Sequence, residues 1–401
     1  MIKVLTNALL IDGKGGVPLE KAALAIENDT ILYAGESKAY TIPESAEVID
    51  VKGKTIIPGL MDCHIHMDLH GMADTDDENH VEDKLRAIRT AYNMKVTLQS
   101  GITTIRNAGS VNHIDFAVKA AVVEGWAEGP RILTSGQIIS MTARGNHYFN
   151  GMYREADGVD EVRKAAREQL KAGADFLKVM ATGAYMNPGG VPGAVQYNLE
   201  ELKVIVEEAD KLGLRVAAHA HGTQGIINAA LAGVKTIEHG SFLDERGIEL
   251  MLEKDIYLVP TFVAGHHILE NALKEGVPKF MIEKNKGMRK IRGDSIRRAI
   301  AAGVKVAFGS DAGTSYNYHG RNAMELLLWV EENFMGPLEA IKCATSIAAE
   351  ALGVEETIGT LEKGKQADLL VVDGNLNKSL DPLLNNVEAV YKAGKKISLL
   401  N

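Results

Sequence analysis

The chain has 401 residues, enough to bury a large core and to hold one large α/β domain with a smaller one beside it. Its formal net charge is −9 and it contains no basic run, which argues against nucleic acid as the main partner. The sequence also has no apolar run long enough to cross a bilayer, which argues against a membrane protein.

Cysteine usage and the first residues indicate the compartment. Cys63 and Cys343 are the two cysteines, too few for a disulfide scaffold, and they favour a reducing environment. The first residues lead directly into strand-like sequence rather than into a signal peptide. We therefore expect a soluble, cytoplasmic protein.

Both ends of the chain read as short strands. Apolar runs within residues 1–58 are separated by turn residues, and similar runs occur at 367–374 and 387–394. Neither end has enough strands to form a stable sheet alone. We therefore expect residues 1–58 and 355–401 to form one small β-sandwich together.

Between the two ends, strands and helices alternate. Two clear helices, 159–172 and 199–212, each stop at a following glycine, Gly173 and Gly213. Eight strand candidates are present: the run that ends near residue 66, then 102–106, 131–135, 176–182, 215–221, 236–239, 257–261 and 305–309. This alternation predicts an α/β protein in which residues 59–354 form a parallel (β/α)8 TIM-like barrel. In that fold, chemistry occurs at the carboxyl ends of the strands.

The first of these strands ends in two histidines. His64 and His66 are two residues apart, so on a strand their side chains share one face, with Ile65 on the other. Two imidazoles on one face can hold a divalent metal such as zinc. Taken alone, a His-x-His pattern occurs often by chance, so the remaining strands decide its meaning.

Polar residues also mark the later strands. Lys178 lies within the apolar run 176–180, where a charged amine is costly to bury, although it could also reach solvent or a carboxylate. A second His-x-His pattern and two single residues complete the set: His219, His221, His239 and Asp311. One histidine at a strand end is usually structural, but this many on different strands of one barrel favour a joint metal site.

These motifs resemble the amidohydrolase superfamily over nearly the whole chain. The resemblance is carried by residues 58–66, by Lys178, His219 and His239, by Gly309-Ser310-Asp311, and by the tail 358–369. It implies a barrel with a split β-sandwich and a centre of two divalent metal ions, with zinc as the expected metal. Members that act as deaminases lack the lysine and use one metal, so Lys178 favours hydrolysis of an amide-type bond.

The resemblance also implies a role for each ligand. His64, His66 and Asp311 would hold the more buried ion, and His219 with His239 the second. Lys178 would bridge both after its amine has reacted with CO2 to give a carboxylated lysine. A water between the ions would become a hydroxide near neutral pH. Asp311 would take its proton and pass it to the leaving nitrogen.

Within the superfamily, the chain is similar to metal-dependent dipeptidases of the Xaa-Pro (prolidase) and Xaa-Arg/Lys types. We therefore expect a dipeptide or N-acyl amino acid as the substrate. In those relatives a histidine after the third strand holds the substrate carboxylate, and the matching position is His147. Arg144 and Asn146 depart from the glycines usual there. His221, which shares a face with His219, is a second candidate for this contact.

Two loops are candidates for specificity. The glycine-rich segment 185–193 could act as a lid, and Tyr185 within it is a candidate substrate-binding residue. The acidic segment 74–78 could attract a cationic substrate side chain, although a solvated acidic turn is the simpler interpretation.

Two other functions remain open. A cyclic amidase of the imidazolonepropionase type shares much of this scaffold, but those relatives have a mononuclear site without the carboxylated lysine. A non-catalytic scaffold would have lost metal ligands, and none is missing here. Homo-oligomers are common in the superfamily, although the sequence shows no interface signal.

Overall fold

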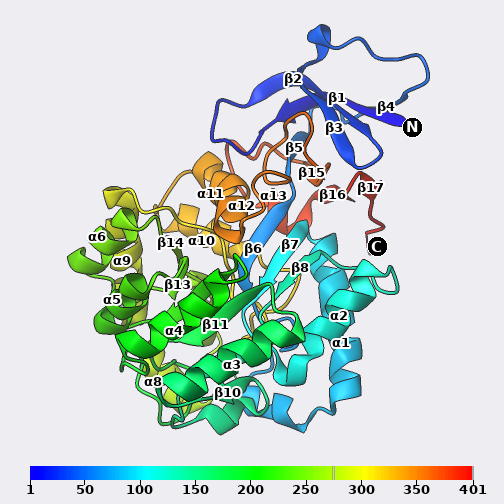
Figure 1. Ribbon diagram of the computed structural model, residues 1–401. Coiled ribbons are helices and arrows are strands. Elements are labelled where there is room, and N and C mark those ends of the chain that lie inside the picture. The colour runs from blue at the N-terminus through cyan, green and yellow to red at the C-terminus, as the bar shows by residue number, and fades with distance from the viewer. Residues whose placement is uncertain (273, 275, 400–401) are drawn as a thin grey trace.

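The computed structural model describes residues 1–272, 274 and 276–399, and it is a mixed α/β protein. In Figure 1 the blue N-terminal strands lie at the top, beside the orange and red segments of the C-terminal end, and the remaining strands and helices lie below them. Among the described residues, no helix combines the length and apolar character that crossing a bilayer requires. Both cysteines are buried and free of disulfide bonds.

One eight-stranded sheet contains strands from both ends of the chain. Its order is β17-β16-β15-β5-β1-β2-β3, and β4 pairs with β1. The strands are β1 (Ile2–Leu10), β2 (Leu19–Glu27), β3 (Thr30–Glu36), β4 (Glu47–Asp50), β5 (Thr55–Pro58), β15 (Leu369–Val372), β16 (Val387–Lys392) and β17 (Lys395–Lys396). The strand β5 joins the two ends, because it runs parallel to β1 and antiparallel to β15.

The strand β5 also separates two cores. Successive strand residues point to opposite faces of a sheet. Ile56 belongs to the apolar cluster of the terminal sheet, whereas the next residue, Ile57, belongs to the large core that runs through the rest of the molecule. Both side chains are fully buried. The terminal sheet is thus anchored to the strand β6, which begins two residues after β5.

We expect Ile56→Ala to lower the free energy of unfolding by about 2–5 kcal/mol, because it leaves a cavity between β1 and β15. Urea denaturation would measure this loss. Val17→Ala is the control: Val17 is 95% exposed, so its truncation should change stability by less than about 0.5 kcal/mol. Equal effects of the two substitutions would contradict the anchoring role of β5.

The remaining strands form two parallel sheets. The first contains β6 (Leu60–Ile65), β7 (Ile102–Asn107) and β8 (Arg131–Thr134). The second has the order β10-β9-β11-β12-β13-β14, made of β9 (Ile138–Ser140), β10 (Tyr153–Glu155), β11 (Phe176–Met180), β12 (Arg215–Ala220), β13 (Thr236–His239) and β14 (Tyr257–Val259). Isolated bridges pair Leu258 with Val306 and Ile65 with Ala312, so residues 306–312 lie between β14 and β6.

The expected strand at 305–309 is present only as a single bridge at Val306. Its backbone bonds β14 at first, since the amide of Ala307 donates to the carbonyl of Leu258. Further along it bonds β6, because the amide of Cys63 donates to the carbonyl of Phe308. The segment changes partner midway, so no continuous ladder forms on either side.

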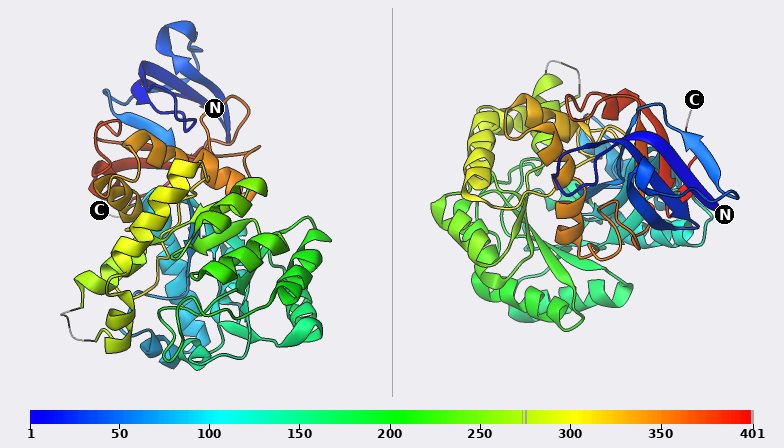
Figure 2. Two further views of the ribbon diagram at one scale, coloured as in Figure 1. Left: turned by 90° about the vertical axis from the view of Figure 1, so that its left-hand side faces the viewer. Right: turned by 90° about the horizontal axis from the view of Figure 1, so that it is seen from above.

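Helices cover the outside of these strands, as the view from above in Figure 2 shows. The predicted helices 159–172 and 199–212 correspond to α3 and α4, and the glycines after them, Gly173 and Gly213, adopt positive φ as expected for helix ends. The helices are α1 (Asp83–Gln99), α2 (Ile114–Val123), α3 (Gly158–Ala172), α4 (Leu199–Asp210), α5 (Thr223–Ala232), α6 (Glu245–Glu253), α7 (Phe262–Glu270), α8 (Lys279–Asn285), α9 (Met288–Ala302), α10 (Met324–Glu331), α11 (Pro337–Cys343), α12 (Ser346–Leu352) and α13 (Pro382–Asn385).

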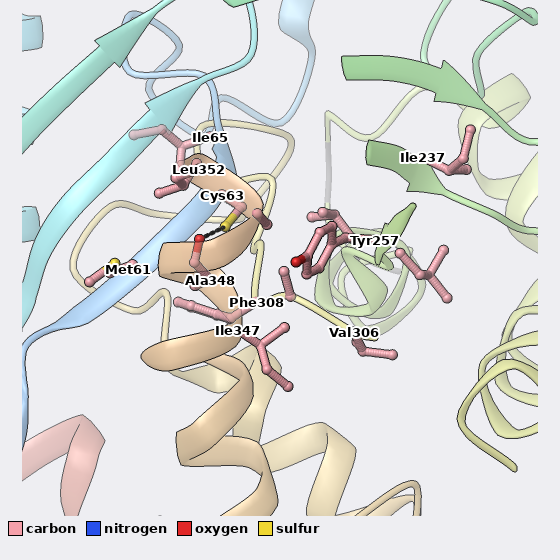
Figure 3. Close-up of a cluster of buried hydrophobic side chains, with 14 of the residues drawn as sticks. Met61, Cys63, Ile65, Ile237, Tyr257, Val306, Phe308, Ile347, Ala348 and Leu352 are labelled. Carbon is pink, nitrogen blue, oxygen red and sulfur yellow. Dashed lines mark hydrogen bonds between the residues drawn. The ribbon is translucent and has the colours of Figure 1, made fainter. Parts of the chain in front are cut away.

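The strand β6 has one apolar face and one polar face. Met61, Cys63 and Ile65 are fully buried, and Figure 3 shows them against the side chains of α12. The thiol of Cys63 lies 3.9 Å from the carbonyl oxygen of Ala348 on that helix. Packing of this face fixes the orientation of the opposite one, which carries His64.

Candidate metal centre

A pocket of about 660 Å³ lies at the carboxyl ends of the parallel strands. Eight of the residues that line it are candidates from the sequence: His64, His66, Lys178, Tyr185, His219, His221, His239 and Asp311. The strands β6, β11, β12 and β13 therefore converge on one space with their polar residues.

Two of these residues have a strained backbone. His239 and Asp311 adopt positive φ values of 73° and 59°, which cost non-glycine residues on the order of 1 kcal/mol each. Backbone hydrogen bonds hold both turns: the amide of Asp311 donates to the carbonyl of His64 at 2.7 Å, and that of Gly240 to Ala220 at 3.1 Å. Such strain is common where a side chain must be aimed at a functional site.

The spacing around Asp311 fits a bound cation. Its Oδ1 lies 3.4 Å from Nε2 of His64 and 3.4 Å from Nε2 of His66. Zinc–ligand distances of about 2.0–2.1 Å in a tetrahedral site place neighbouring ligand atoms roughly 3.4 Å apart. The ligand atoms of His219, His221 and His239 also lie within 4.8 Å of one another, as do those of His64, His239 and Asp311.

Four buried polar atoms of residues that line the pocket have no hydrogen-bond partner among the described residues: Nζ of Lys178, Nε2 of His219, Oδ1 of Asp311 and the hydroxyl oxygen of Tyr185. Unsatisfied buried polar atoms are costly and rare in folded proteins. Desolvation lowers the pKa of the Lys178 amine to about 8, although the charges of Glu238 and Asp311 oppose this shift. Ligands that supply the missing interactions would explain all four atoms.

The five histidines of the pocket, His64, His66, His219, His221 and His239, have the protonation state and orientation of neutral metal ligands. In four of them Nδ1 contacts a protein oxygen: Glu238 for His64, Gly109 for His66, Ser241 for His221 and Thr261 for His239. Such contacts fix the ring and leave Nε2 for a metal. Desolvation lowers the pKa of all five rings, and that of His66 to about 4. The rings are therefore uncharged at neutral pH and can donate a lone pair.

A buried ion pair lies behind this ligand set. Oε2 of Glu238 is 2.6 Å from Nδ1 of His64, and Oε1 accepts a 2.7 Å hydrogen bond from Nη2 of Arg106. Nε of Arg106 donates to the carbonyl of Cys63 at 2.6 Å. Although burial acts in the opposite direction, the charges of Arg106 and Lys178 hold the pKa of Glu238 well below its usual range. Glu238 is therefore an anion that orients His64.

Arg106 and Glu238 were not among the residues predicted from the sequence. Both are charged residues at fully or almost fully buried strand positions, on β7 and β13. That combination was the available signal, because a charge within an apolar strand needs a partner. Arg292, which lines the pocket from the helix α9, was not predicted either, because nothing in the helical pattern distinguishes it from its neighbours.

Of the predicted substrate-binding residues, two lie at the pocket and one does not. The ring of Tyr185 meets that of His221 edge-on, with centroids 4.5 Å apart. His147 is exposed on a short 3-10 helix, Asn146–Phe149, and does not line the pocket. The acidic segment is also outside the pocket, where Asp74 accepts a hydrogen bond from Tyr148 and the buried Glu78 pairs with Arg86.

This fold and this site are those of an amidohydrolase. The model of the amidohydrolase family matches residues 55–397, and the chain belongs to that family. The resemblance seen in the motifs is thereby confirmed. The family is generally metal-dependent, in agreement with the cluster of histidines and Asp311. The chain is a hydrolase that acts on carbon–nitrogen bonds.

The chain is similar to several characterised proteins over nearly its whole length. Ochratoxinase of Aspergillus niger is 33% identical, over 98% of this chain and 86% of that protein. Imidazolonepropionase of Thermoanaerobacter pseudethanolicus is 28% identical, over 94% and 90%. The crystal structure of a Xaa-Pro dipeptidase with bound methionine covers 99% of this chain and 100% of its own, with a TM-score of 0.91 and 31% identity.

We expect His66→Ala to lower the amount of zinc that the purified protein binds, because the substitution removes one of the nitrogens beside Asp311. Elemental analysis after dialysis against zinc would measure it. His147→Ala is the matched control, since that ring is exposed and outside the pocket, and it should bind as much zinc as the unmodified protein. Absence of metal from the unmodified protein would contradict the metal centre.

Proposed function

We propose that the protein is a metal-dependent amidohydrolase that cleaves the amide or peptide bond of a dipeptide or an N-acyl amino acid, of the Xaa-Pro or Xaa-Arg/Lys type. The observation that carries this proposal is the buried amine of Lys178, which lacks a protein partner and lies in one pocket with the histidines and Asp311. The likeness to a Xaa-Pro dipeptidase supports the substrate class.

We also infer the fold that this proposed function implies. Residues 59–354 would form a closed (β/α)8 barrel, and residues 1–58 with 355–401 a β-sandwich. The bridges at Val306 and Ala312, which connect β14 to β6, support closure of the barrel. The sheet shared by both ends of the chain supports the second unit.

The donor set fits two divalent ions, with zinc as the first candidate. His64, His66 and Asp311 would hold one, and His219 with His239 the other. Bound ions of this kind lower the pKa of water and polarise a substrate carbonyl. Lys178 would join the two sites as a carboxylated lysine.

Carboxylation accounts for the burial of Lys178. The uncharged amine attacks CO2, a nitrogen–carbon bond forms and a proton is released, so a cation that is costly to bury becomes an anion with two oxygen ligands. Burial favours the first requirement, since it lowers the pKa of the amine to about 8. The neighbouring imidazoles are neutral, so they place no positive charge against the amine.

Asp311 would move the proton. Its Oδ1 accepts no hydrogen bond from the described residues and faces Nε2 of both His64 and His66. A carboxylate in that place can accept a proton from water and deliver it to the leaving nitrogen. Tyr185 and His221, which meet edge-on at the pocket wall, would contact the substrate.

A cyclic amidase of the imidazolonepropionase type is the second candidate, favoured by the 28% identity to such an enzyme. Lys178 weighs against it, because those relatives have no carboxylated lysine. A screen of dipeptides, N-acyl amino acids and imidazolonepropionate with the zinc-loaded protein separates the two candidates. A protein that binds zinc but hydrolyses none of these compounds would favour a non-catalytic scaffold.

We expect Asp311→Asn to keep much of the bound metal but to lower the rate of hydrolysis by about 100-fold or more, because the amide cannot accept the proton. The rate on the best substrate of the screen would measure this. Asp210→Asn, at an exposed position on α4, is the control and should leave the rate unchanged. Full activity of the Asp311 variant would remove this residue from proton transfer.

We expect CO2-dependent reactivation of the metal-stripped protein to follow the charge of Lys178. With a pKa of about 8, the amine is mostly protonated below that pH and unreactive, so the rate should rise about tenfold per pH unit and level off above pH 8. Activity would be followed after addition of zinc at a fixed CO2 concentration. Lys178→Gln should show no response. A rise that continues to about pH 10 would indicate an ordinary, exposed lysine.

A further inference from the structure

One cation of the pocket is not used by the proposed metal centre. Arg292 lies on α9, is 6% exposed and lines the pocket. Its Nε donates a 3.2 Å hydrogen bond to Oγ of Ser241. Among the described residues, no aspartate or glutamate forms an ion pair with its guanidinium. A buried charge without a counter-ion is costly, so this arrangement points to a partner that arrives with the ligand.

Arg292 lies next to the two candidate substrate residues. The carbon of its guanidinium is 4.8 Å from the centre of the Tyr185 ring. The hydroxyl of Ser241, which accepts from Arg292, also lies 2.8 Å from Nδ1 of His221. The guanidinium, a phenol and an imidazole therefore gather at one part of the pocket wall. The guanidinium and the phenol carry hydrogen-bond donors suited to an anion.

A glycine on the adjacent helix makes room for this cation. Gly265 lies on α7 and lines the pocket. A Cβ added at Gly265 would clash with Nη1 of Arg292. The guanidinium thus rests directly against the backbone of α7, which holds its terminal nitrogens beside the pocket.

We propose that Arg292 binds the carboxylate of the substrate, an inference that rests on the proposed amide hydrolysis. The planar guanidinium offers two parallel N–H groups to a carboxylate, a geometry that a lysine ammonium cannot reproduce. In an N-acyl amino acid or dipeptide, the free carboxylate is one carbon away from the scissile nitrogen. Binding it would therefore orient the amide toward the metal ligands.

The other residues of the pocket wall determine which substrate side chains fit. It is mostly apolar, formed by Leu69, Ile138, Phe149, Met152, Met180 and Ile268. Among the described residues that line the pocket, Asp311 is the only acidic one, and it belongs to the metal centre. No second carboxylate there could pair with a cationic side chain. The pocket therefore fits substrates with neutral, apolar side chains, proline included, better than the Xaa-Arg/Lys type.

Binding of a product-like acid and its amide tests this inference without turnover. The probes are L-methionine and L-methioninamide, titrated into zinc-loaded protein by calorimetry. The unmodified protein should prefer the acid on the order of 100-fold, the range measured for buried charge pairs. Arg292→Met should abolish this preference and leave the affinity for the amide unchanged. Arg292→Lys should restore it in part, because the charge returns without the planar fork.

A glycine variant and its control test whether the position of the Arg292 guanidinium determines binding of the acid. Gly265→Ala should weaken acid binding, because its Cβ displaces the guanidinium. Gly293→Ala is the matched control on α9: it also lies within a helix, but the nearest atom to its Cβ is 3.3 Å away. Arg297→Met, at a half-exposed position of the same helix, is the control for loss of an arginine.

The outcomes distinguish this inference from the proposed function. Equal affinity of the unmodified protein for acid and amide would overturn the role of Arg292, and so would an acid preference that survives in Arg292→Met. An intact acid preference in a protein that hydrolyses no compound of the amide screen would instead overturn amide hydrolysis and leave the carboxylate site standing.

Discussion

The burial of one lysine amine is the constraint on which the site depends. Lys178 lies in the middle of β11, is 2% exposed and has no hydrogen-bond partner among the described residues. An isolated ammonium in such a place is strongly destabilised, which is why its pKa falls to about 8. The surrounding rings are neutral, and the negative charges of Glu238 and Asp311 oppose the fall of this pKa only in part. The amine therefore loses its proton more readily than that of an exposed lysine, which favours chemistry at the nitrogen.

Charged residues also hold the candidate metal ligand His64 in place. Arg106 and Glu238 form a buried pair that ties the backbone of Cys63 to the ring of His64. Replacing one member would leave the other charged and unpaired, so the pair stabilises this geometry only as a unit. The apolar face of β6, packed on α12, prevents the strand from rotating. Together they hold His64 in place from both sides.

Two basic residues of the pocket, Lys178 and Arg292, form no ion pair with the described residues, and they mark two different parts of it. Lys178 lies with the candidate metal ligands, whereas Arg292 lies with Tyr185 and Ser241. Metal chemistry and carboxylate recognition would then use separate parts of one cavity. Solved structures of a Xaa-Pro dipeptidase and of ochratoxinase share the fold, so the second part is where we expect differences in specificity.

The sequence alone determined whatever depends on local spacing. Alternation along β6 and β12, continued one residue past the end of each strand, brought paired histidines into one pocket, and the glycines after α3 and α4 adopt the positive φ expected at helix ends. Only the tertiary structure decided the contacts between distant segments: the pairing of Arg106 with Glu238, the approach of Arg292 from α9, and the exposed position of His147. The physical reason is that a side-chain period reports which way a residue faces within its own element. The partner that it meets depends on how elements far apart in the chain pack together.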